Sequence, residues 1–111
     1  MLVAIRFRLP DTEAADFLDR AQTALRALAA MPGYVDGGVG RATEDPTLWL
    51  MSLRWESVGA YRRALGAYDV KVAAVPLLST AIDEPTAFEL LADVDHRRDS
   101  DRAADDSRSQ R

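Results

Sequence analysis

Residues 48–57 read LWLMSLRWES, and this stretch decides the fold of the chain. Large apolar side chains alternate with Ser52, Arg54 and Glu56, and a period of two residues predicts a half-buried β-strand. Ser57 then predicts the start of a helix, because its hydroxyl accepts a hydrogen bond from an unpaired N–H group of the first helical turn. The side chains expected on the buried face of the strand are Trp49, Met51, Leu53 and Trp55.

Two further elements precede this strand. Residues 2–9 alternate in the same way and predict a first strand, which Pro10 ends. We expect Asp11 or Thr12 to cap the helix that follows. Its apolar positions recur at helical spacing: Ala14, Phe17, Leu18, Ala21, Leu25 and Leu28.

A hairpin is predicted between this helix and residues 48–57. Met31-Pro32-Gly33 ends the helix, because proline breaks the hydrogen-bond ladder and glycine accepts the positive φ of a helix end. Residues 34–41 alternate as a strand, with Val35 and Val39 on one side. Glu44-Asp45-Pro46 has the composition of a turn and closes the hairpin.

The residues that follow, up to residue 91, predict a second helix, a short helical stretch and a last strand. The inner face of the second helix is expected to hold Val58, Tyr61, Leu65 and Tyr68. Asp69 is expected to cap another short helical stretch, and Pro76 breaks or restarts it. Residues 86–91 predict a last strand, in which Phe88 and Leu90 alternate with Glu89.

The predicted order is therefore βαββαβ, an α+β ferredoxin-like fold with a four-stranded antiparallel sheet and helices on one face. The other face is mixed, and charges that become buried there must be paired. We expect a second copy to cover this face, giving a homodimer. Its predicted members are Arg6, Arg8, Asp36, Ser52, Arg54 and Glu89, together with Leu2, Ala4, Tyr34, Leu48 and Leu50.

Length and composition limit the classes of function. A chain of 111 residues predicts one domain, for which we expect residues 1–92, followed by a charged, disordered C-terminal tail over residues 93–111. A net charge of −4 gives no reason to expect nucleic acid or an anionic membrane as a partner. The N-terminus has neither the basic start nor the apolar core of a secretion signal, so we expect a cytoplasmic protein.

Residue types that are absent exclude several chemistries. The chain has no Cys, which excludes a thiol nucleophile and Cys-ligated metals. It also has no Asn, and its only histidine is His96, which we expect to be a solvated residue of the tail. We therefore expect no metal site and no Ser-His-Asp triad within the domain.

The arrangement resembles the antibiotic-biosynthesis monooxygenase family over residues 1–92. The segments that carry the resemblance are Met31-Pro32-Gly33-Tyr34, Glu44-Asp45-Pro46 and Trp55-Glu56-Ser57. The resemblance implies a dimeric α+β barrel, in which two subunits pair sheet to sheet, with one pocket per subunit between sheet and helices. Family members include cofactor-free oxygenases of polycyclic phenols and quinols, haem-degrading monooxygenases, and proteins with no established activity.

The haem-degrading branch fits poorly at the positions that handle haem. That branch is similar around Trp55, but it has a second tryptophan where this chain has Ala64 and an axial histidine where this chain has Ala74. Its first-strand asparagine falls at about Arg6. We expect no haem degradation and no cofactor.

The resemblance therefore implies a cofactor-independent monooxygenase that acts on an aromatic, polyketide-type or quinol small molecule. Two alternatives from other classes stay open: a non-catalytic dimeric module that binds a small apolar ligand or a partner protein, and an isomerase or cyclase.

For such chemistry, Arg54 and Arg6 are candidates to stabilise a phenolate or enolate, and Tyr34 is a candidate donor to a substrate oxygen. The alternative for the arginines is structural pairing with Asp36 or Glu89. The aromatic residues could stack on a substrate ring or simply pack in the core. The candidates for the substrate pocket are Trp49, Trp55, Tyr61 and Tyr68.

Two other motifs are weaker. Gly37-Gly38-Val39-Gly40 lies within a predicted strand, so it does not predict a phosphate loop. It predicts a bulge or a close backbone approach, or it leaves room for a ligand. Asp83-Glu84 reads as a solvated loop with no assigned role.

Overall fold

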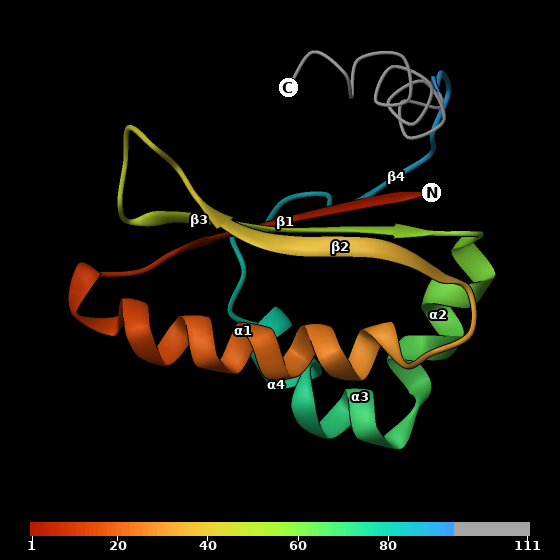
Figure 1. Ribbon diagram of the computed structural model, residues 1–111, viewed down its shortest axis with the longest axis horizontal. Coiled ribbons are helices and arrows are strands. Elements are labelled where there is room, and N and C mark those ends of the chain that lie inside the picture. The colour runs from red at the N-terminus through yellow and green to blue at the C-terminus, as the bar shows by residue number, and fades with distance from the viewer. Residues whose placement is uncertain (95–111) are drawn as a thin grey trace, which may run out of the picture.

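The computed structural model describes residues 1–94 as one sheet with helices packed on one side (Figure 1). The elements in chain order are β1 (Leu2–Arg8), the short 3-10 turn η1 (Asp11–Glu13), α1 (Ala14–Ala29), β2 (Tyr34–Arg41), β3 (Leu48–Trp55), α2 (Val58–Gly66), α3 (Tyr68–Ala73), α4 (Val75–Leu78) and β4 (Ala87–Phe88). The predicted tail lies outside the described residues except for Asp93 and Val94, and so does His96.

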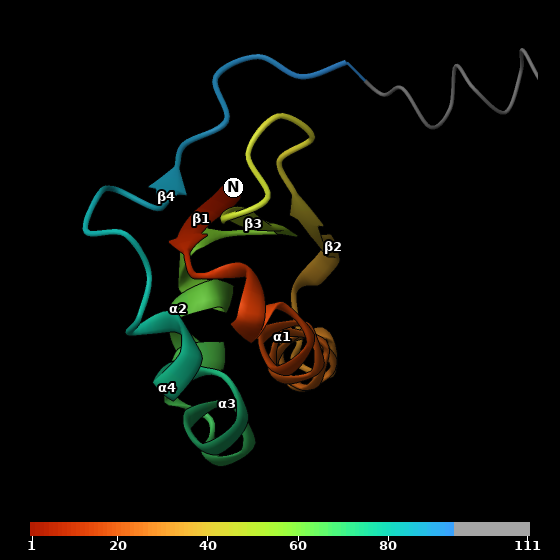
Figure 2. The same cartoon turned by 90° about the vertical axis from the view of Figure 1, so that its left-hand side faces the viewer.

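The sheet has the strand order β2-β3-β1-β4, and each neighbouring pair is antiparallel. Seen from the side, helices α1 to α4 all lie on one side of the sheet (Figure 2). The predicted α+β ferredoxin-like fold is confirmed. We call the face that packs on the helices the helix face, and the other the open face.

The helix face of the sheet supplies seven of the seventeen buried residues of the core. Trp49, Met51, Leu53 and Trp55 of β3 are all buried, as the alternation predicted. Opposite them, half of the buried residues in the helical layer are alanine, which lets the helix backbones approach the sheet closely. The buried helical residues include Ala21, Ala24 and Leu28 of α1, with Ala60, Tyr61 and Ala64 of α2.

Of the three predicted caps, one is confirmed. The Ala60 N–H donates to Ser57 Oγ at 3.1 Å at the start of α2. The expected cap by Asp11 or Thr12 is wrong, because these residues form the turn η1 and Glu13 takes the N-cap position of α1. The cap by Asp69 is also wrong, since α3 begins at Tyr68 and Asp69 lies within its first turn.

The second helix is shorter than predicted. It ends at Gly66, and Ala67 takes an extended conformation with φ −71° and ψ 143°. This break turns Tyr68 out of the predicted inner face, so that 79% of its surface is exposed. Val58 is also exposed. Tyr61 is buried as predicted, Leu65 is half-buried, and Ala60 and Ala64 complete the inner face.

A bulge in β2 changes which side chains share a face. Tyr34 pairs with Trp55 and Asp36 with Arg54, so one residue, Val35, is extra on β2. An extra residue reverses the alternation of a strand. Tyr34 therefore lies on the helix face, and its predicted place on the mixed face is wrong. Val35 is exposed rather than buried beside Val39.

The last strand is also shorter than predicted, and its faces are reversed. Phe88 pairs with Leu2 and Ala87 with Val3, which places Phe88 on the open face. The predicted place of Glu89 on that face is therefore wrong. Because β1 begins at Leu2, no β1 backbone is left for residues 89–91 to pair with. Residues 89–94 instead leave the sheet on the side opposite the helices (Figure 2).

The turn after α1 is fixed by close packing at Gly33. This residue has φ 91°, as expected for glycine at a helix end, and a Cβ placed on it would overlap the Ala60 side chain. The Glu56 N–H also donates to the Gly33 carbonyl at 2.8 Å. The turn is therefore held against α2 and the end of β3.

We expect Gly33→Ala to destabilise the protein by about 2–4 kcal/mol, because alanine must adopt an unfavourable positive φ and overlap Ala60. Urea unfolding at one fixed protein concentration measures this. The matched control is Gly66→Ala, which has ordinary φ and no atom among the described residues within 4 Å of the added Cβ. Gly66→Ala should change stability by less than about 1 kcal/mol. Equal midpoints for the two variants would contradict this account of the turn.

Candidate functional site

The open face has the mixed character that the sequence predicted. Arg6 and Arg54 both lie on it, but they pair with Leu50 and Leu2, respectively, so they are four residues apart along the strands. Gly38 and Gly40 add a strip without side chains on β2. The predicted members that the strand pairing places here are Leu2, Ala4, Arg6, Arg8, Asp36, Leu48, Leu50, Ser52 and Arg54.

Each arginine of the open face is paired with a carboxylate. Arg6 donates to both oxygens of Glu84 at 2.9 and 2.7 Å, which raises the pKa of Arg6 and lowers that of Glu84. Arg54 donates to Asp93 at 2.9 Å. Glu84, read from the sequence as part of a solvated loop without a role, is therefore the partner of a candidate catalytic residue.

The third pair holds the β2–β3 hairpin to β1. Arg8 donates to Asp45 Oδ2 at 2.9 Å, and the hydroxyl and N–H groups of Thr47 donate to Asp45 Oδ1. The hydrogen bond from the Thr47 hydroxyl, followed by those from Arg8 and from the Thr47 N–H, lowers the pKa of Asp45 to about 2.

A shallow hollow of about 270 Å³ lies over this sheet near the hairpin. Its lining is mostly apolar, and Arg6 supplies a charge at its edge. Among the predicted site residues, Arg6 and Trp49 line it. The other lining residues are Gly40, Arg41, Ala42, Leu48 and Leu50.

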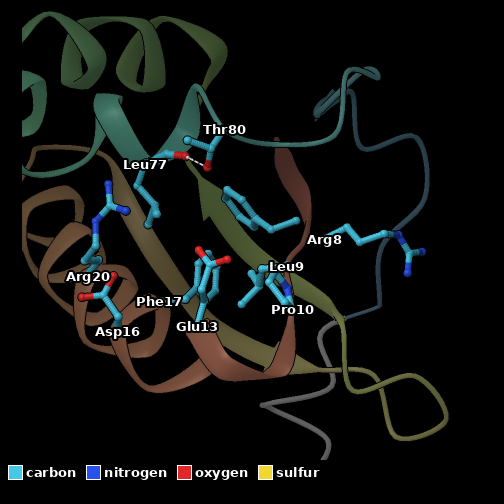
Figure 3. A pocket seen from close by; sticks show the side chains of 10 residues that line it. Arg8, Leu9, Pro10, Glu13, Asp16, Phe17, Arg20, Leu77 and Thr80 are labelled. Atoms are coloured by element: carbon cyan, nitrogen blue, oxygen red, sulfur yellow. Dashed lines mark hydrogen bonds between the residues drawn. The ribbon is translucent and has the colours of Figure 1, made fainter.

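A different cavity, of about 180 Å³, lies between the sheet and the helices, where β1 ends and α1 begins (Figure 3). Phe7 and Phe17 form an apolar wall of this cavity, and their ring centroids are 5.0 Å apart. Glu13, Asp16 and Arg20 supply charge from the start of α1. The remaining lining residues are Arg8, Leu9, Pro10, Leu77 and Thr80.

The side chains of this cavity differ in direction. The Glu13 carboxylate points into the cavity, toward the side on which Leu77 and Thr80 lie, whereas Arg8 points away from it (Figure 3). Arg20 extends from α1 toward Leu77. The Thr80 hydroxyl donates to the Leu77 carbonyl at 2.7 Å. Glu13 is thus the carboxylate best placed to meet a polar group of a ligand.

Three of the four aromatic residues predicted for the pocket lie in two clusters at opposite ends of β3, whereas Tyr68 is exposed and lies in neither. Trp49 packs on Phe17 at 5.2 Å, with the Arg41 guanidinium 5.3 Å from its ring. Trp55 packs on Tyr34 at 5.4 Å and on Tyr61 at 5.5 Å, and burial raises the pKa of both tyrosines. The two indoles are six residues apart, about 20 Å along a strand.

Both indole N–H groups are buried without a hydrogen-bond partner in the part of the chain that the structure describes. An unpaired buried donor costs about 1–3 kcal/mol. Gly37 makes room for the second cluster, because a Cβ on it would lie 2.7 Å from the Tyr34 hydroxyl. The glycine run thus contains a close approach at Gly37 and open space at Gly38 and Gly40, whereas the bulge of β2 lies before the run, between Tyr34 and Asp36.

Residues 1–94 were compared with the requirements of a metal site, a membrane span and a haem site. No group of three or more His, Cys, Asp or Glu side chains there is arranged to hold a metal ion. None of the helices in that range has the length and apolar character needed to cross a bilayer. Ala64 and Ala74 are buried in the core, so these positions present no nitrogen ligand to a haem iron.

Comparison with known proteins places the fold in a family. The chain matches the family described as antibiotic biosynthesis monooxygenase over residues 1–74. Since this match spans more than half of its length, the chain belongs to that family. No curated protein matches it in sequence.

Solved structures that share the fold include the following two. One is SnoaB from Streptomyces nogalater, described as a cofactor-independent oxygenase, with 22% identity and a TM-score of 0.63, covering 83% of this chain and 96% of that one. The other is a conserved protein from Methanosarcina mazei Go1, with 21% identity and a TM-score of 0.64, covering 78% of this chain and 84% of that one. At these identities the likeness establishes the fold alone.

The hydrogen bonds at Asp45 predict how its contribution to stability depends on pH. Its folded pKa of about 2 lies below the ordinary 3.8, so its contribution is present above about pH 5 and lost as pH falls toward about 2. Asp45→Asn should therefore lower the unfolding midpoint near neutral pH, and its difference from the wild type should shrink toward about pH 2.

Thr47→Val is the companion variant for this measurement. It removes a hydroxyl donor of similar shape, so the Asp45 pKa should rise and the loss of stability should begin at a higher pH than in the wild type. A difference between Asp45→Asn and the wild type that is constant across the acid range would contradict the assignment.

Proposed function

We propose that the protein is a cofactor-independent monooxygenase of phenols or hydroquinols, and that its substrate binds in the cavity at the start of α1. The observation that carries the proposal is the Glu13 carboxylate, which points into a cavity walled by Phe7 and Phe17. Membership of the antibiotic biosynthesis monooxygenase family supports the reaction class. An aromatic wall beside an exposed carboxylate suits a substrate that combines a ring with a hydroxyl group.

The reaction needs only the substrate and O₂. For a simple phenol, the ring gains one oxygen atom at the position opposite its hydroxyl and loses two hydrogens, giving a para-quinone, and the other oxygen atom leaves as water. The substrate supplies all four electrons. Glu13 accepts the phenolic proton, and Arg20 stabilises negative charge on the ring oxygen.

The sequence predicted catalytic roles for Arg54, Arg6 and Tyr34. These roles remain proposals, and they concern parts of the protein other than the cavity at α1. Arg6 edges the hollow of the open face, where Glu84 beside it is a carboxylate acceptor. Tyr34 lies on the other face with Trp55 and Tyr61. We favour the cavity at α1 because residues of both the sheet and the helices line it and the Glu13 carboxylate points into it.

A second candidate function is a non-catalytic ligand-binding module. What favours it is the packing of Trp55, Tyr34 and Tyr61, aromatic residues that fill the core with one another rather than facing an empty space. An isomerase or cyclase would use the same cavity without O₂. Oxygen consumption separates both of these from the monooxygenase.

We also propose that two subunits pair through their open faces. Leu50 and Phe88 are exposed on this face, and its arginines already have carboxylate partners, so covering it removes apolar surface from water without leaving charges unpaired.

The test of the reaction is oxygen uptake with a panel of phenols and hydroquinols, with no added flavin, haem or metal. We expect uptake by the wild type and a loss of about 100-fold or more in kcat for Glu13→Gln, which keeps the shape but cannot accept the proton. Glu44→Gln, an exposed carboxylate of the hairpin, is the matched control and should retain activity. No uptake across the panel would contradict the function, and loss in Arg54→Ala or Arg6→Ala but not in Glu13→Gln would move the site to the open face.

The test of the dimer is sedimentation at micromolar concentration. We expect a dimer for the wild type and a monomer for Leu50→Asp, which places an unpaired charge at the centre of the open face. Val58→Asp is the control, because Val58 is equally exposed, at 42% against 41% for Leu50, but lies on α2. A well-folded wild-type monomer would overturn the pairing.

A further inference from the structure

The cavity at the start of α1 has a neighbour on the other side of Arg20 and Leu77. This second hollow, of about 340 Å³, lies between α1 and the pair α3 and α4. Arg20 and Leu77 line both spaces, so these two side chains form the partition between them. A ligand that passes the partition would occupy both.

The two spaces have different chemistry. The first has the Glu13 and Asp16 carboxylates at its wall, together with the two phenylalanine rings. In the second, the floor is aliphatic, and Asp19 and Thr23 of α1 supply its polar edge. The aliphatic residues are Val72, Ala73, Pro76 and Leu77. A polar space therefore continues into an apolar one.

The size of the first space limits what ring it admits. Pockets for drug-sized ligands have volumes of about 300–1,000 Å³. The first space, at about 180 Å³, is below this range and suits one aromatic ring rather than a fused polycycle. The second space is larger and has no aromatic side chain in its lining, which suits a flexible aliphatic chain.

We propose, building on the proposed function, that the substrate is amphiphilic: a single hydroxylated ring in the first space, with an aliphatic tail that runs past Arg20 into the second. The partition has one fixed member and one adjustable member. Leu77 is 2% exposed and packed in the core, whereas Arg20 is an exposed side chain with a flexible stem. Its methylene groups can lie along the tail while its guanidinium stays in water.

The test measures binding without turnover, so that it does not depend on the reaction. Calorimetric titration under argon with 3-ethyl-, 3-butyl-, 3-hexyl- and 3-octylphenol, in which the position opposite the hydroxyl is free, gives Kd as a function of chain length. Each methylene that enters an apolar space should tighten binding about fourfold. We expect this trend over the first members of the series and a plateau once the second space is filled.

Val72→Asp locates the tail. Val72 lines the second space and is 61% exposed, so the substitution puts a charge there without disturbing the core. It should abolish the gain with chain length and leave the Kd of 3-ethylphenol within about twofold. Val58→Asp, which lines neither space, should keep the wild-type trend.

Three outcomes bear on the proposal differently. A Kd that does not change with chain length in the wild type overturns the amphiphilic substrate. A trend that persists in Val72→Asp overturns the second space as the site of the tail. A normal trend without oxygen uptake supports the ligand class and contradicts only the monooxygenase.

Discussion

The two unlike faces of β3 are the constraint on which the rest of the structure depends. This strand is hydrogen-bonded to β1 on one side and to β2 on the other, so it cannot rotate to exchange its faces. Trp49 and Trp55 on one face are too large to be left in water, which requires helices over the whole length of the strand. The same alternation places Arg54 and Leu50 on the other face, where the helices do not reach.

The division of the sheet also separates two kinds of polar group. On the open face, arginines and carboxylates neutralise one another, and Glu84 and Asp93 reach over from the C-terminal part of the chain to do so. At the start of α1, by contrast, Glu13 points into a cavity beside aromatic rings. A reaction that needs a carboxylate without an arginine partner therefore fits the cavity at the start of α1 better than the open face of the sheet.

The periodicity of apolar residues was sufficient to predict the order of strands and helices along the chain. Burying one face of an element imposes a period of two residues on a strand and of about 3.6 residues on a helix. Periodicity failed for Tyr34, since an extra residue in a strand leaves no trace in composition, and for residues 89–91, since a strand is only as long as its neighbour. The position of Arg6 on the open face was predictable from local parity. Glu13 was not predictable as a site residue, because it meets Phe7 and Leu77 only after β1, α1 and α4 have packed together.

The extra residue at Val35 has a consequence for comparing family members. After Val35, the side chains of β2 alternate in the opposite sense to those before it. If one of two relatives lacks the extra residue, an alignment based on the hydrophobic pattern of this strand pairs inward-facing positions with outward-facing ones. Aligning such relatives on the strand partners, Asp36 with Arg54 and Val39 with Met51, avoids the error. Gains and losses of single residues at this point would also let evolution swap the side chains shown to the helices without altering the sheet.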